Sequence, residues 1–388
     1  MRRTVACLCT VALPLASGKV YFSETFDDSW SSRWTLSEWK KSEGTQGTFE
    51  LATGKWFKDE AADKGLQTSQ DSRFFGISAS FDSFSNEGKD LYIQYQAKYE
   101  KDVECGGGYV KVGPKMPDPT AFGDPTVYNI MFGPDKCGYN KRTHLIFTYK
   151  GKNVLKKSDL PYKQDGEGTS HLYRLVLKQD STVAVEIDGT EVYTGSMKDD
   201  WEILPPKEIS DPEDKKPSDW ADSAMMDDPE DKKPDDWVEE KRIVDPEATK
   251  PDDWDDEEDG EWEPPMKDNP AFKGEWKVKR ISNPAYKGVW EARKIPNPDF
   301  VDEPSLYKYD DFGFIGFDLW QVKGGTIFDN VIITDEKEEA DKFAAKWSEL
   351  SEHEKAEKKK EDDAKSSASK VEEDEEDDDV EDDEKEEM

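Results

Sequence analysis

Apolar residues are scarce in this chain. Of its 388 residues only 34% are hydrophobic, whereas 37% are charged. The hydrophobic fraction is below that of an average globular domain, which predicts that a large part of the chain forms no core of its own. The sequence nevertheless contains 13 Trp, which simple disorder does not explain. Some part of it must therefore bind or pack aromatic rings.

Basic residues are also few. The sequence has 54 Lys and Arg against 90 Asp and Glu, a formal net charge of −36. Nucleic acids and anionic membranes are bound through patches of Lys and Arg, so this balance argues against both as partners. Cations and basic protein surfaces remain as candidate partners.

Several common catalytic and metal-binding motifs are missing. The chain has three His and contains neither Gly-x-Ser-x-Gly nor a phosphate-binding P-loop. Its acidic repeats, described below, do not have the Asp-x-Asp-x-Asp-Gly spacing of an EF-hand. It also has no Asn-x-Ser/Thr acceptor, so we expect no N-glycan on the protein itself.

A long apolar run occurs only at the N-terminus. Arg2 and Arg3 precede the run Val5–Ala16, and small residues follow it. This pattern is typical of a secretory signal peptide over residues 1–18, with cleavage before Lys19. The run is too short for a membrane span, and no later stretch is apolar enough to cross a bilayer. A buried N-terminal strand is the alternative interpretation.

Cysteine is rare too. Of the four Cys, Cys7 and Cys9 lie in the predicted signal peptide, which leaves Cys105 and Cys137. In an oxidising compartment an isolated pair favours one disulfide, which closes a loop of about 30 residues and contributes about 3 kcal/mol. Two free buried thiols are the alternative. Without Cys-x-x-Cys spacing the pair does not indicate a zinc or redox site.

Residues 19–204 have the pattern of β structure. Strand-like segments rich in β-branched and aromatic residues occur at 91–97, 144–149, 172–177 and 182–187. Short strands at this density predict an antiparallel sandwich or jelly roll. Similar sequence resumes at 312–320 and 326–333, so residues 301–335 should complete the same two sheets.

Residues 205–300 have a different composition and repeat themselves. The stretch from 205 to 304 contains 15 of the 22 Pro. The unit Asp211–Trp220 recurs at Asp228–Trp237 and Asp245–Trp254, and three Gly-x-Trp units follow, ending at Trp262, Trp276 and Trp290. Three units of one type and then three of another predict a long hairpin arm with Trp rings between its limbs. A disordered acidic linker is the alternative.

The C-terminal part is helical in composition and then strongly acidic. Residues 336–360 place Phe343, Trp347 and Leu350 on one helical face. The last 28 residues, 361–388, hold 17 acids and 3 Lys, a net charge of −14, and should be a disordered tail. Carboxylates are hard ligands that suit Ca²⁺, so the tail could store it weakly and in quantity, or it could serve solubility alone.

One pattern resembles an enzyme site. Glu186 and Glu191 have the spacing of the paired acids of jelly-roll β-glucanases, in which one carboxyl attacks and the other protonates. A surface hairpin explains it more simply, because Val183, Val185 and Ile187 alternate before the turn dipeptide Asp188-Gly189. The pattern does not suggest the burial that would raise an acid's pKa. We therefore do not expect an enzyme.

Residues near the two mature cysteines favour sugar binding. Tyr109 and Lys111 follow Cys105 on one strand face, and the segment Tyr128–Asp135 precedes Cys137. Aromatic rings stack on the apolar faces of sugars, while Lys and Asp bond their hydroxyls. A disulfide would join the two segments that bear these groups.

Together these motifs resemble the calreticulin family of lectin chaperones of the endoplasmic reticulum. The resemblance covers nearly all of the chain after residue 18 and rests on residues 106–111, 128–137, 318–321, 325–330 and both repeat types. The related calnexin branch has four units of each repeat and a membrane span, whereas this chain has three and none. The resemblance implies a concanavalin-like jelly-roll lectin domain, a Pro-rich arm and a non-enzymatic, monomeric chaperone.

The resemblance also implies a ligand, the monoglucosylated high-mannose N-glycan of unfinished glycoproteins. The family's glucose contacts match Tyr109, Lys111, Tyr128, Asp135 and Asp318, and its pocket lining matches Met131, Ile146 and Trp320.

The family's single tight Ca²⁺ site falls on Asp329 and on the backbone carbonyls of Thr25, Ala62 and Lys64. Carbonyl ligands tolerate any side chain, so Thr25 and Ala62 are compatible with the site.

Two further matches concern the arm and one histidine. Asp259, Glu261 and Trp262 match the arm tip that docks a basic thiol-disulfide isomerase. His171 matches a histidine linked to chaperone behaviour, although a structural hydrogen-bonding role is equally compatible.

The C-terminus departs from the family pattern. The chain ends in Lys385-Glu-Glu-Met388 and not in the K-D-E-L retrieval signal. We expect the lumen of the endoplasmic reticulum, or secretion if this ending does not support retrieval. A secreted Ca²⁺-binding interaction protein without a retained lectin role, and a glycanase using Glu186 and Glu191, are the competing hypotheses.

Overall fold

The computed structural model describes residues 18–163, 167–255, 257–258 and 260–383, with side chains as far as Ser367. The chain forms two compact units. Residues 206–298 form one, and the segments before and after them form the other. Residues 1–17 of the predicted signal peptide, Cys7 and Cys9 among them, and the terminal residues Lys385–Met388 lie outside the described residues.

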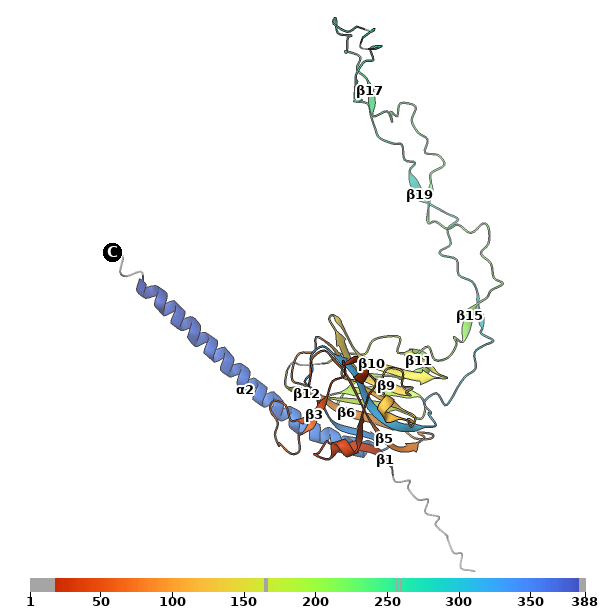
Figure 1. The fold of residues 1–388 in the computed structure, drawn as a ribbon. Helices are drawn as coiled ribbons and strands as arrows, with labels where there is room; N and C mark the ends of the chain where they lie inside the picture. Colours follow the sequence, from red (N-terminus) through yellow and green to blue (C-terminus); the bar gives the residue numbers. More distant parts are fainter. Residues whose placement is uncertain (1–17, 164–166, 256, 259, 384–388) are drawn as a thin grey trace, which may run out of the picture. The chain divides into compact units, whose positions relative to one another are not determined.

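The larger unit is a sandwich of two eight-stranded antiparallel sheets (Figure 1). The first sheet contains, in spatial order, β14 (Thr190–Ser196), β13 (Thr182–Ile187), β12 (Thr169–Leu177), β6 (Leu91–Tyr99), β22 (Thr326–Thr334), β4 (Gly65–Thr68) and β3 (Phe49–Ala52), and β1 (Val20–Glu24) also pairs with β22. The second contains β11 (Lys152–Leu155), β10 (Asn140–Tyr149), β9 (Ile130–Cys137), β7 (Cys105–Gly107), β21 (Phe312–Gln321), β5 (Arg73–Phe84) and β2 (Trp34–Leu36), and β8 (Val110–Gly113) pairs with β9 and β21. The predicted jelly-roll-like sandwich is confirmed.

The core lies between the two sheets and is rich in aromatic rings. On β21, Ile315, Phe317 and Leu319 belong to the main buried cluster. The ring of Phe317 stacks on that of Phe328 from β22, with 4.1 Å between centroids. Because side chains alternate along a strand, Gly316 and Asp318 lie on the opposite face of the second sheet. That outer face carries most of the predicted sugar-binding residues.

The predicted disulfide is confirmed. Cys105 on β7 pairs directly with Cys137 on β9, and the two sulfur atoms are bonded. Four short helical turns lie in the connections: η1 (Trp30–Ser32), η2 (Lys41–Glu43), η3 (Pro119–Ala121) and α1 (Met197–Asp200).

The arm is a two-limbed hairpin, as predicted, and its limbs run side by side in Figure 1. Three short antiparallel pairs join the limbs: β15 (Glu208–Ser210) with β20 (Lys294–Pro296), β16 (Met225–Asp227) with β19 (Arg280–Ser282), and β17 (Arg242–Val244) with β18 (Met266–Asp268). Each three-residue strand half-buries only its central side chain, and no described apolar residue of the arm is fully buried.

Each Trp of the first repeat connects the two limbs. The indole Nε1 atoms of Trp220, Trp237 and Trp254 donate to the carbonyl oxygens of Gly288, Gly274 and Gly260 at 2.9, 2.8 and 2.9 Å. Trp237 also packs edge-on against Trp276, with 4.8 Å between centroids. The arm therefore obtains its order from repeated cross-limb contacts and not from a core.

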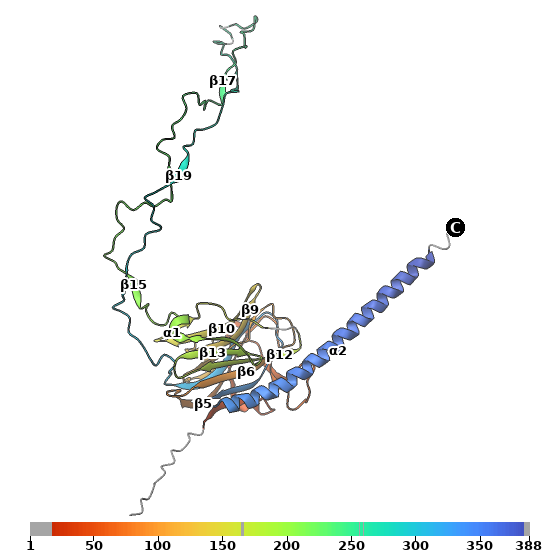
Figure 2. The same cartoon turned by 180° about the vertical axis from the view of Figure 1, so that it is seen from behind.

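A long helix, α2 (Lys337–Asp383), packs on the first sheet against β12, β22 and β6 (Figure 2). Trp347 and Leu350 are buried as expected, and Phe343 is half-buried. The helix continues beyond Lys360, where we expected an unstructured tail to begin. Pairs one turn apart support this extension, with Lys358 3.6 Å from Asp362 and Lys365 2.7 Å from Glu361. No helix in the described part of the chain is both long and apolar enough to span a membrane.

A buried ion pair fixes α2 to the sheet. The Nζ atom of Lys98 on β6 lies 3.1 Å from Oε1 of Glu354, and both side chains are almost fully buried. Ser170 donates its backbone N–H and its hydroxyl to the other oxygen of Glu354, at 2.8 and 2.7 Å. Such a pair contributes little net free energy, but removal of one partner typically costs 3–5 kcal/mol because a charge stays buried. It therefore specifies where the helix sits.

Candidate functional site

The outer face of the second sheet aligns four of the predicted residues in neighbouring strands. Lys111 on β8 pairs with Gly316 on β21 on one side and with Met131 on β9 on the other. Met131 in turn pairs with Ile146 on β10. Cross-strand partners point to the same face, so these side chains form one row. Asp318 lies two residues beyond Gly316, on that same face.

A buried ion pair forms the polar centre of this face. The Nζ atom of Lys111 lies 2.6 Å from Oδ2 of Asp318, and their side chains are only 6% and 10% exposed. The same ammonium lies 5.3 Å from the ring centroid of Tyr128, within range of a cation–π interaction. The pair thus places strong hydrogen-bonding groups in an otherwise apolar surface.

A small apolar cluster surrounds the pair and is separate from the main core. It consists of Phe122, Tyr128, Met131, Ile146 and Phe314, with Tyr109 and Met116 packed against it. Burial raises the pKa of the Tyr109 phenol, and the carboxylates of Asp318 and Asp135 raise it further. Burial also raises the pKa of Tyr128. Both phenols therefore stay protonated at neutral pH and can donate a hydrogen bond.

Asp135 and Trp320 flank this cluster. Asp135 on β9 lies opposite Gly107, and its Oδ2 is 3.3 Å from Nε2 of His144. Trp320 is 36% exposed on β21, and its ring centroid lies 4.6 Å from that of Phe74. Next to the cluster there are therefore a carboxylate, that of Asp135, and an exposed aromatic ring, that of Trp320.

Sequence reasoning missed several members of this site. His144 contacts Asp135 and packs edge-on against Tyr109, with 6.1 Å between ring centroids. Strand alternation could have identified it, because it lies two residues before Ile146 on β10. Phe122, which caps η3, and Phe314 on β21 also belong to the cluster and were not among the predicted site residues.

The combination has the chemistry of a sugar site. Protonated phenols donate, carboxylates accept, and exposed aromatic carbon covers the apolar face of a pyranose ring.

Glu186 and Glu191 are cross-strand partners in the β13–β14 hairpin. Asp188 and Gly189 between them have φ of 53° and 71°, the left-handed turn geometry expected for this dipeptide. The carboxylate of Glu186 is 3.1 Å from the guanidinium of Arg174. These contacts have the geometry of a structural hairpin.

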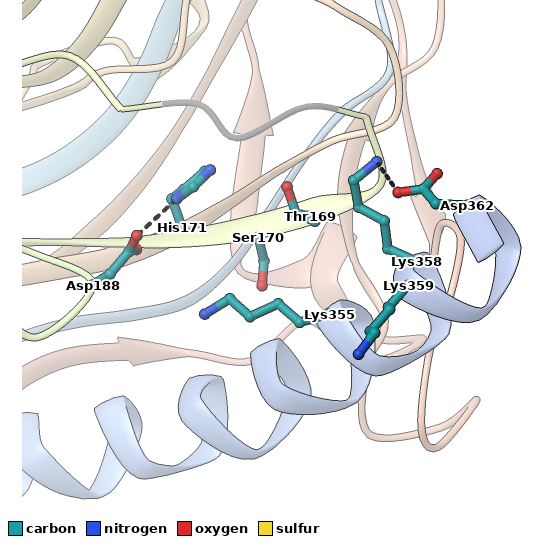
Figure 3. Close-up of a pocket in the computed structure, with 8 residues that line it drawn as sticks. All are labelled: Thr169, Ser170, His171, Asp188, Lys355, Lys358, Lys359 and Asp362. Carbon is teal, nitrogen blue, oxygen red and sulfur yellow. Dashed lines mark hydrogen bonds and ion pairs between the residues drawn. The ribbon is translucent and has the colours of Figure 1, made fainter. Parts of the chain in front are cut away.

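His171 lies in a pocket of about 330 Å³ between β12 and α2 (Figure 3). The lining residues are Thr169, Ser170, His171, Asp188, Lys355, Lys358, Lys359 and Asp362. Nδ1 of His171 is 2.9 Å from Oδ2 of Asp188, which is also 2.6 Å from Nζ of Lys163. Burial raises the pKa of Asp188, but these two partners outweigh it and lower the pKa to about 2. His171 is thus held by a fixed carboxylate.

Asp329 on β22 is a buried carboxylate with an unsatisfied oxygen. Its side chain is 3% exposed, and Oδ1 has no hydrogen-bond partner among the described residues. Burial raises the pKa of this carboxyl well above its usual range. A β-bulge begins at Asp329, and Asn330 has a φ of 49°, so the strand is locally bent at this point. An orphaned buried oxygen of this kind fits a hard cation such as Ca²⁺.

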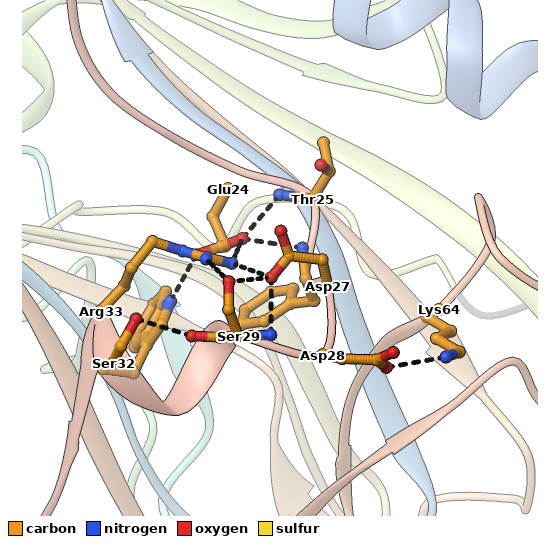
Figure 4. A network of polar contacts seen from close by, with 10 residues as sticks. Glu24, Thr25, Asp27, Asp28, Ser29, Ser32, Arg33 and Lys64 are labelled. Carbon is orange, nitrogen blue, oxygen red and sulfur yellow. Dashed lines mark hydrogen bonds and ion pairs between the residues drawn. The ribbon is translucent and has the colours of Figure 1, made fainter.

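The segments that carry Thr25 and Lys64 meet at this part of β22. Glu24, which precedes Thr25, pairs with Val331, and Gly65, which follows Lys64, lies against Asp329. Glu24 accepts from the backbone N–H groups of Thr25 and Phe26 and from Arg33, so its carboxylate orders the turn (Figure 4). Lys64 pairs with Asp28 at 2.8 Å, also drawn in Figure 4.

Ala62 lies two residues before Lys64, with its N–H bonded to Asp59 at 3.0 Å. No three His, Cys, Asp or Glu side chains converge anywhere in the described ranges. The Ca²⁺ ligand set of Asp329 and the backbone carbonyls of Thr25, Ala62 and Lys64 stays a prediction, and it needs only one carboxylate.

The predicted arm tip is only partly described. Asp259 lies outside the described residues. Glu261 is exposed and Trp262 half-buried in the turn that joins β17 to β18. Trp254 donates to Gly260 beside them, so the last Trp of the first repeat fixes the base of this turn.

Comparison with known proteins identifies close relatives. The model of the Calreticulin family matches residues 22–260 and 258–333. A calreticulin of Chlamydomonas reinhardtii is 56% identical over 358 residues, which span 91% of this chain and 84% of the relative. A calreticulin of Homo sapiens is 57% identical over 336 residues, which span 86% and 79%. The solved globular domain of T. cruzi calreticulin aligns with 89% of this chain and all of its own, at 27% identity and a TM-score of 0.63.

The cation site yields a stability prediction. Replacement of Asp329 by Asn should leave the calcium-free protein at least as stable, because it removes a buried carboxylate. It should abolish the rise in Tm produced by Ca²⁺, which in the unchanged protein corresponds to about 2.7 kcal/mol at a hundredfold excess over Kd. Thermal unfolding with and without Ca²⁺ measures both effects.

Two control variants sharpen this test. The exposed carboxylate of Asp159, 67% exposed, offers Asp159→Asn, which should keep the full response. A chain lacking residues 368–388 should keep the Tm response but lose weak, high-capacity binding in equilibrium dialysis. An Asp329→Asn protein that Ca²⁺ still stabilises fully would contradict the assignment.

Proposed function

The chain belongs to the calreticulin family, and on that premise we propose that it is a lectin chaperone for the monoglucosylated high-mannose N-glycans of unfinished glycoproteins. The family is one of calcium-binding lectin chaperones and not of enzymes. The observation that carries the specific proposal is the Lys111–Asp318 pair, 2.6 Å apart, inside the apolar cluster that includes Tyr109 and Tyr128.

The proposed mode of binding follows from these groups. The terminal glucose would lie on the row formed by Lys111, Met131 and Ile146. The ammonium of Lys111 and the phenols of Tyr109 and Tyr128 would donate to its hydroxyl oxygens, while Asp318 and Asp135 would accept from its hydroxyls. Trp320, exposed at the edge, would stack on the next sugar.

Pre-organisation supports this arrangement. Asp318 and Lys111 already hold each other in the absence of sugar, so little side-chain entropy is lost on binding. A glycan without the terminal glucose would make none of the hydrogen bonds to this pair, which would account for rejection of unglucosylated glycans.

Loss of one charged partner should greatly weaken sugar binding. Asp318→Asn and Lys111→Met each remove a charge-assisted hydrogen bond, so we expect Kd for a monoglucosylated oligosaccharide to rise about 10- to 100-fold. Tyr109→Phe, which removes only a hydroxyl, should have a smaller effect. Isothermal titration calorimetry measures these changes, and circular dichroism verifies that each variant is folded.

Tyr139→Phe is the matched control, because Tyr139 is fully exposed in the turn between β9 and β10 and should not affect binding. An oligosaccharide without the terminal glucose should bind at least tenfold more weakly. The lectin proposal fails if removal of the glucose makes no difference.

The second part of the proposal concerns the arm. We expect its tip to recruit a basic thiol-disulfide isomerase to the bound glycoprotein, because Glu261 and Trp262 match the family's docking residues and the surrounding repeats are acidic. Glu261→Lys and Trp262→Ala should each weaken this binding by tenfold or more, as measured by biolayer interferometry. Glu291→Lys, an equal charge change in the returning limb, should have little effect; equal losses in all three variants would point to non-specific electrostatics.

The third part concerns the compartment. We propose residence in the lumen of the endoplasmic reticulum, with the acidic tail from residue 361 as a weak Ca²⁺ store. If Lys385–Met388 supports retrieval, the untagged chain should co-fractionate with this compartment, and Met388→Leu should change its distribution little. Accumulation of the native chain in the medium, reversed by Met388→Leu, would instead indicate a secreted protein.

A further inference from the structure

The residue before β1, Lys19, is hydrogen-bonded to Asp335, which lies far away in the sequence. The backbone N–H of Lys19 donates to Oδ1 of Asp335, which lies between β22 and α2. The carbonyl oxygen of Lys19 accepts from the Thr334 hydroxyl at 3.0 Å and from the Asp335 N–H at 3.2 Å. Lys19 is therefore held on both sides before the β1–β22 pairing starts at Val20.

The carboxylate of Asp335 is surrounded by hydrogen-bond donors, one of them a cation. Its side chain is 6% exposed, and its Oδ2 accepts from Tyr21 at 2.7 Å and from the Lys89 ammonium at 2.6 Å. Burial raises the pKa of Asp335, but the N–H of Lys19 and the two side chains outweigh it, so the pKa falls below its usual value. The carboxylate is ionised at neutral pH, with one oxygen directed at Lys19.

The sequence predicts that the leader is removed before Lys19. Hydrolysis of the Gly18–Lys19 peptide bond consumes one water and gives a carboxylate on Gly18 and an amine on Lys19. The new amine takes up a proton at neutral pH, since α-amino groups have a pKa of about 7.7–8.0. The atom that becomes the ammonium is the nitrogen already bonded to Asp335.

We propose that the α-ammonium of Lys19, created by leader removal, is an internal ligand of Asp335 that locks β1 onto β22. Processing replaces the neutral amide donor to the Asp335 carboxylate by an ammonium, so the hydrogen bond becomes an ion pair without moving the chain, because donor and acceptor are already in contact. A bond between an ammonium and a poorly exposed carboxylate, in which both partners are charged, is stronger than the bond from the uncharged amide that it replaces. The ion pair between the Lys19 α-ammonium and Asp335 is thus absent in the precursor and present in the processed chain.

The charged groups around the ammonium determine its pH dependence. It faces Asp335, Lys89 and Tyr21, and its own side-chain Nζ lies 5.4 Å from the Tyr21 ring. Glu336, just before α2, lies beside Gly18, and Lys337 at the start of α2 forms an ion pair with Asp341 at 2.6 Å. A partner carboxylate raises the folded-state pKa of the amine. The added stability is therefore present below about pH 7.7 and is lost as the pH rises through the folded-state value.

The test compares two chains that differ by the residues Ser17 and Gly18, and hence in the position of the terminal charge. One chain starts at Lys19 and the other at Ser17, each combined with Asp335 or Asp335→Asn. At pH 6.5 the Lys19 chain should have a Tm about 2–4 °C higher than the Ser17 chain. This gap should disappear in the Asp335→Asn pair and should shrink between pH 8 and 10. Asp159→Asn, a remote exposed acid, should leave it unchanged.

Each outcome decides for or against the proposal. Mass spectrometry of the chain exported from a eukaryotic cell should give an N-terminus at Lys19, and another N-terminus overturns it. A Tm gap that persists in Asp335→Asn, or no gap at all between the two chains, also overturns it. These measurements involve no glycan, so their failure is distinct from failure of the lectin proposal.

Discussion

The pairing of β21 and β22 into the two sheets is the constraint on which the rest of the structure depends. Both strands follow the arm in the chain, yet β22 lies between β6 and β4 in one sheet and β21 pairs with β5, β7 and β8 in the other. Without them the second sheet would be divided into two parts, and the first into two parts with β1 left unpaired. Phe317 and Phe328, which stack across the core, come from these same two strands.

The same two strands also carry the functional groups. Asp318 and Trp320 project from β21 beside Lys111, and Asp329 sits at the bulge of β22. The proposed sugar face and the proposed cation site are therefore assembled by the step that closes the sandwich. Helix α2 follows β22 directly and is held to the first sheet by the Lys98–Glu354 ion pair. This buried pair fixes the position of the helix along the sheet, as the Lys111–Asp318 pair fixes two side chains on the second sheet.

Local sequence patterns predicted the elements well, because their signals are local. Alternation in β6, β12 and β13, the Asp188-Gly189 turn, the repeat period of the arm and the helical spacing of Trp347 and Leu350 all depend on neighbours within a few residues. The disulfide followed from having two cysteines left after the signal peptide. Tyr109, Lys111 and the segment Tyr128–Asp135 were indicated by their positions near the two cysteines. Ile146, Asp318 and Trp320 came from family resemblance, since no local pattern indicates which distant strands become neighbours.

What could not be predicted is non-local. His144 acquires its role only because β9 and β10 pair in a register that brings it to Asp135. Nothing in the sequence around Glu354 indicates that it is buried against Lys98 and Ser170, which come from distant strands. Near Lys360, Lys358 and Lys365 pair with acids one turn away, and the composition of this segment alone does not indicate these contacts.

The insertion of the arm has a consequence for how the protein is made. Because β21 begins only at Phe312, a ribosome must add roughly a hundred residues after β14 before either sheet can close. At about 5–20 residues per second, this leaves the first strands without their central partners for several seconds. During that interval Cys105 and Cys137 are both already available, so the disulfide can join β7 to β9 and hold half of the second sheet until its missing strand arrives.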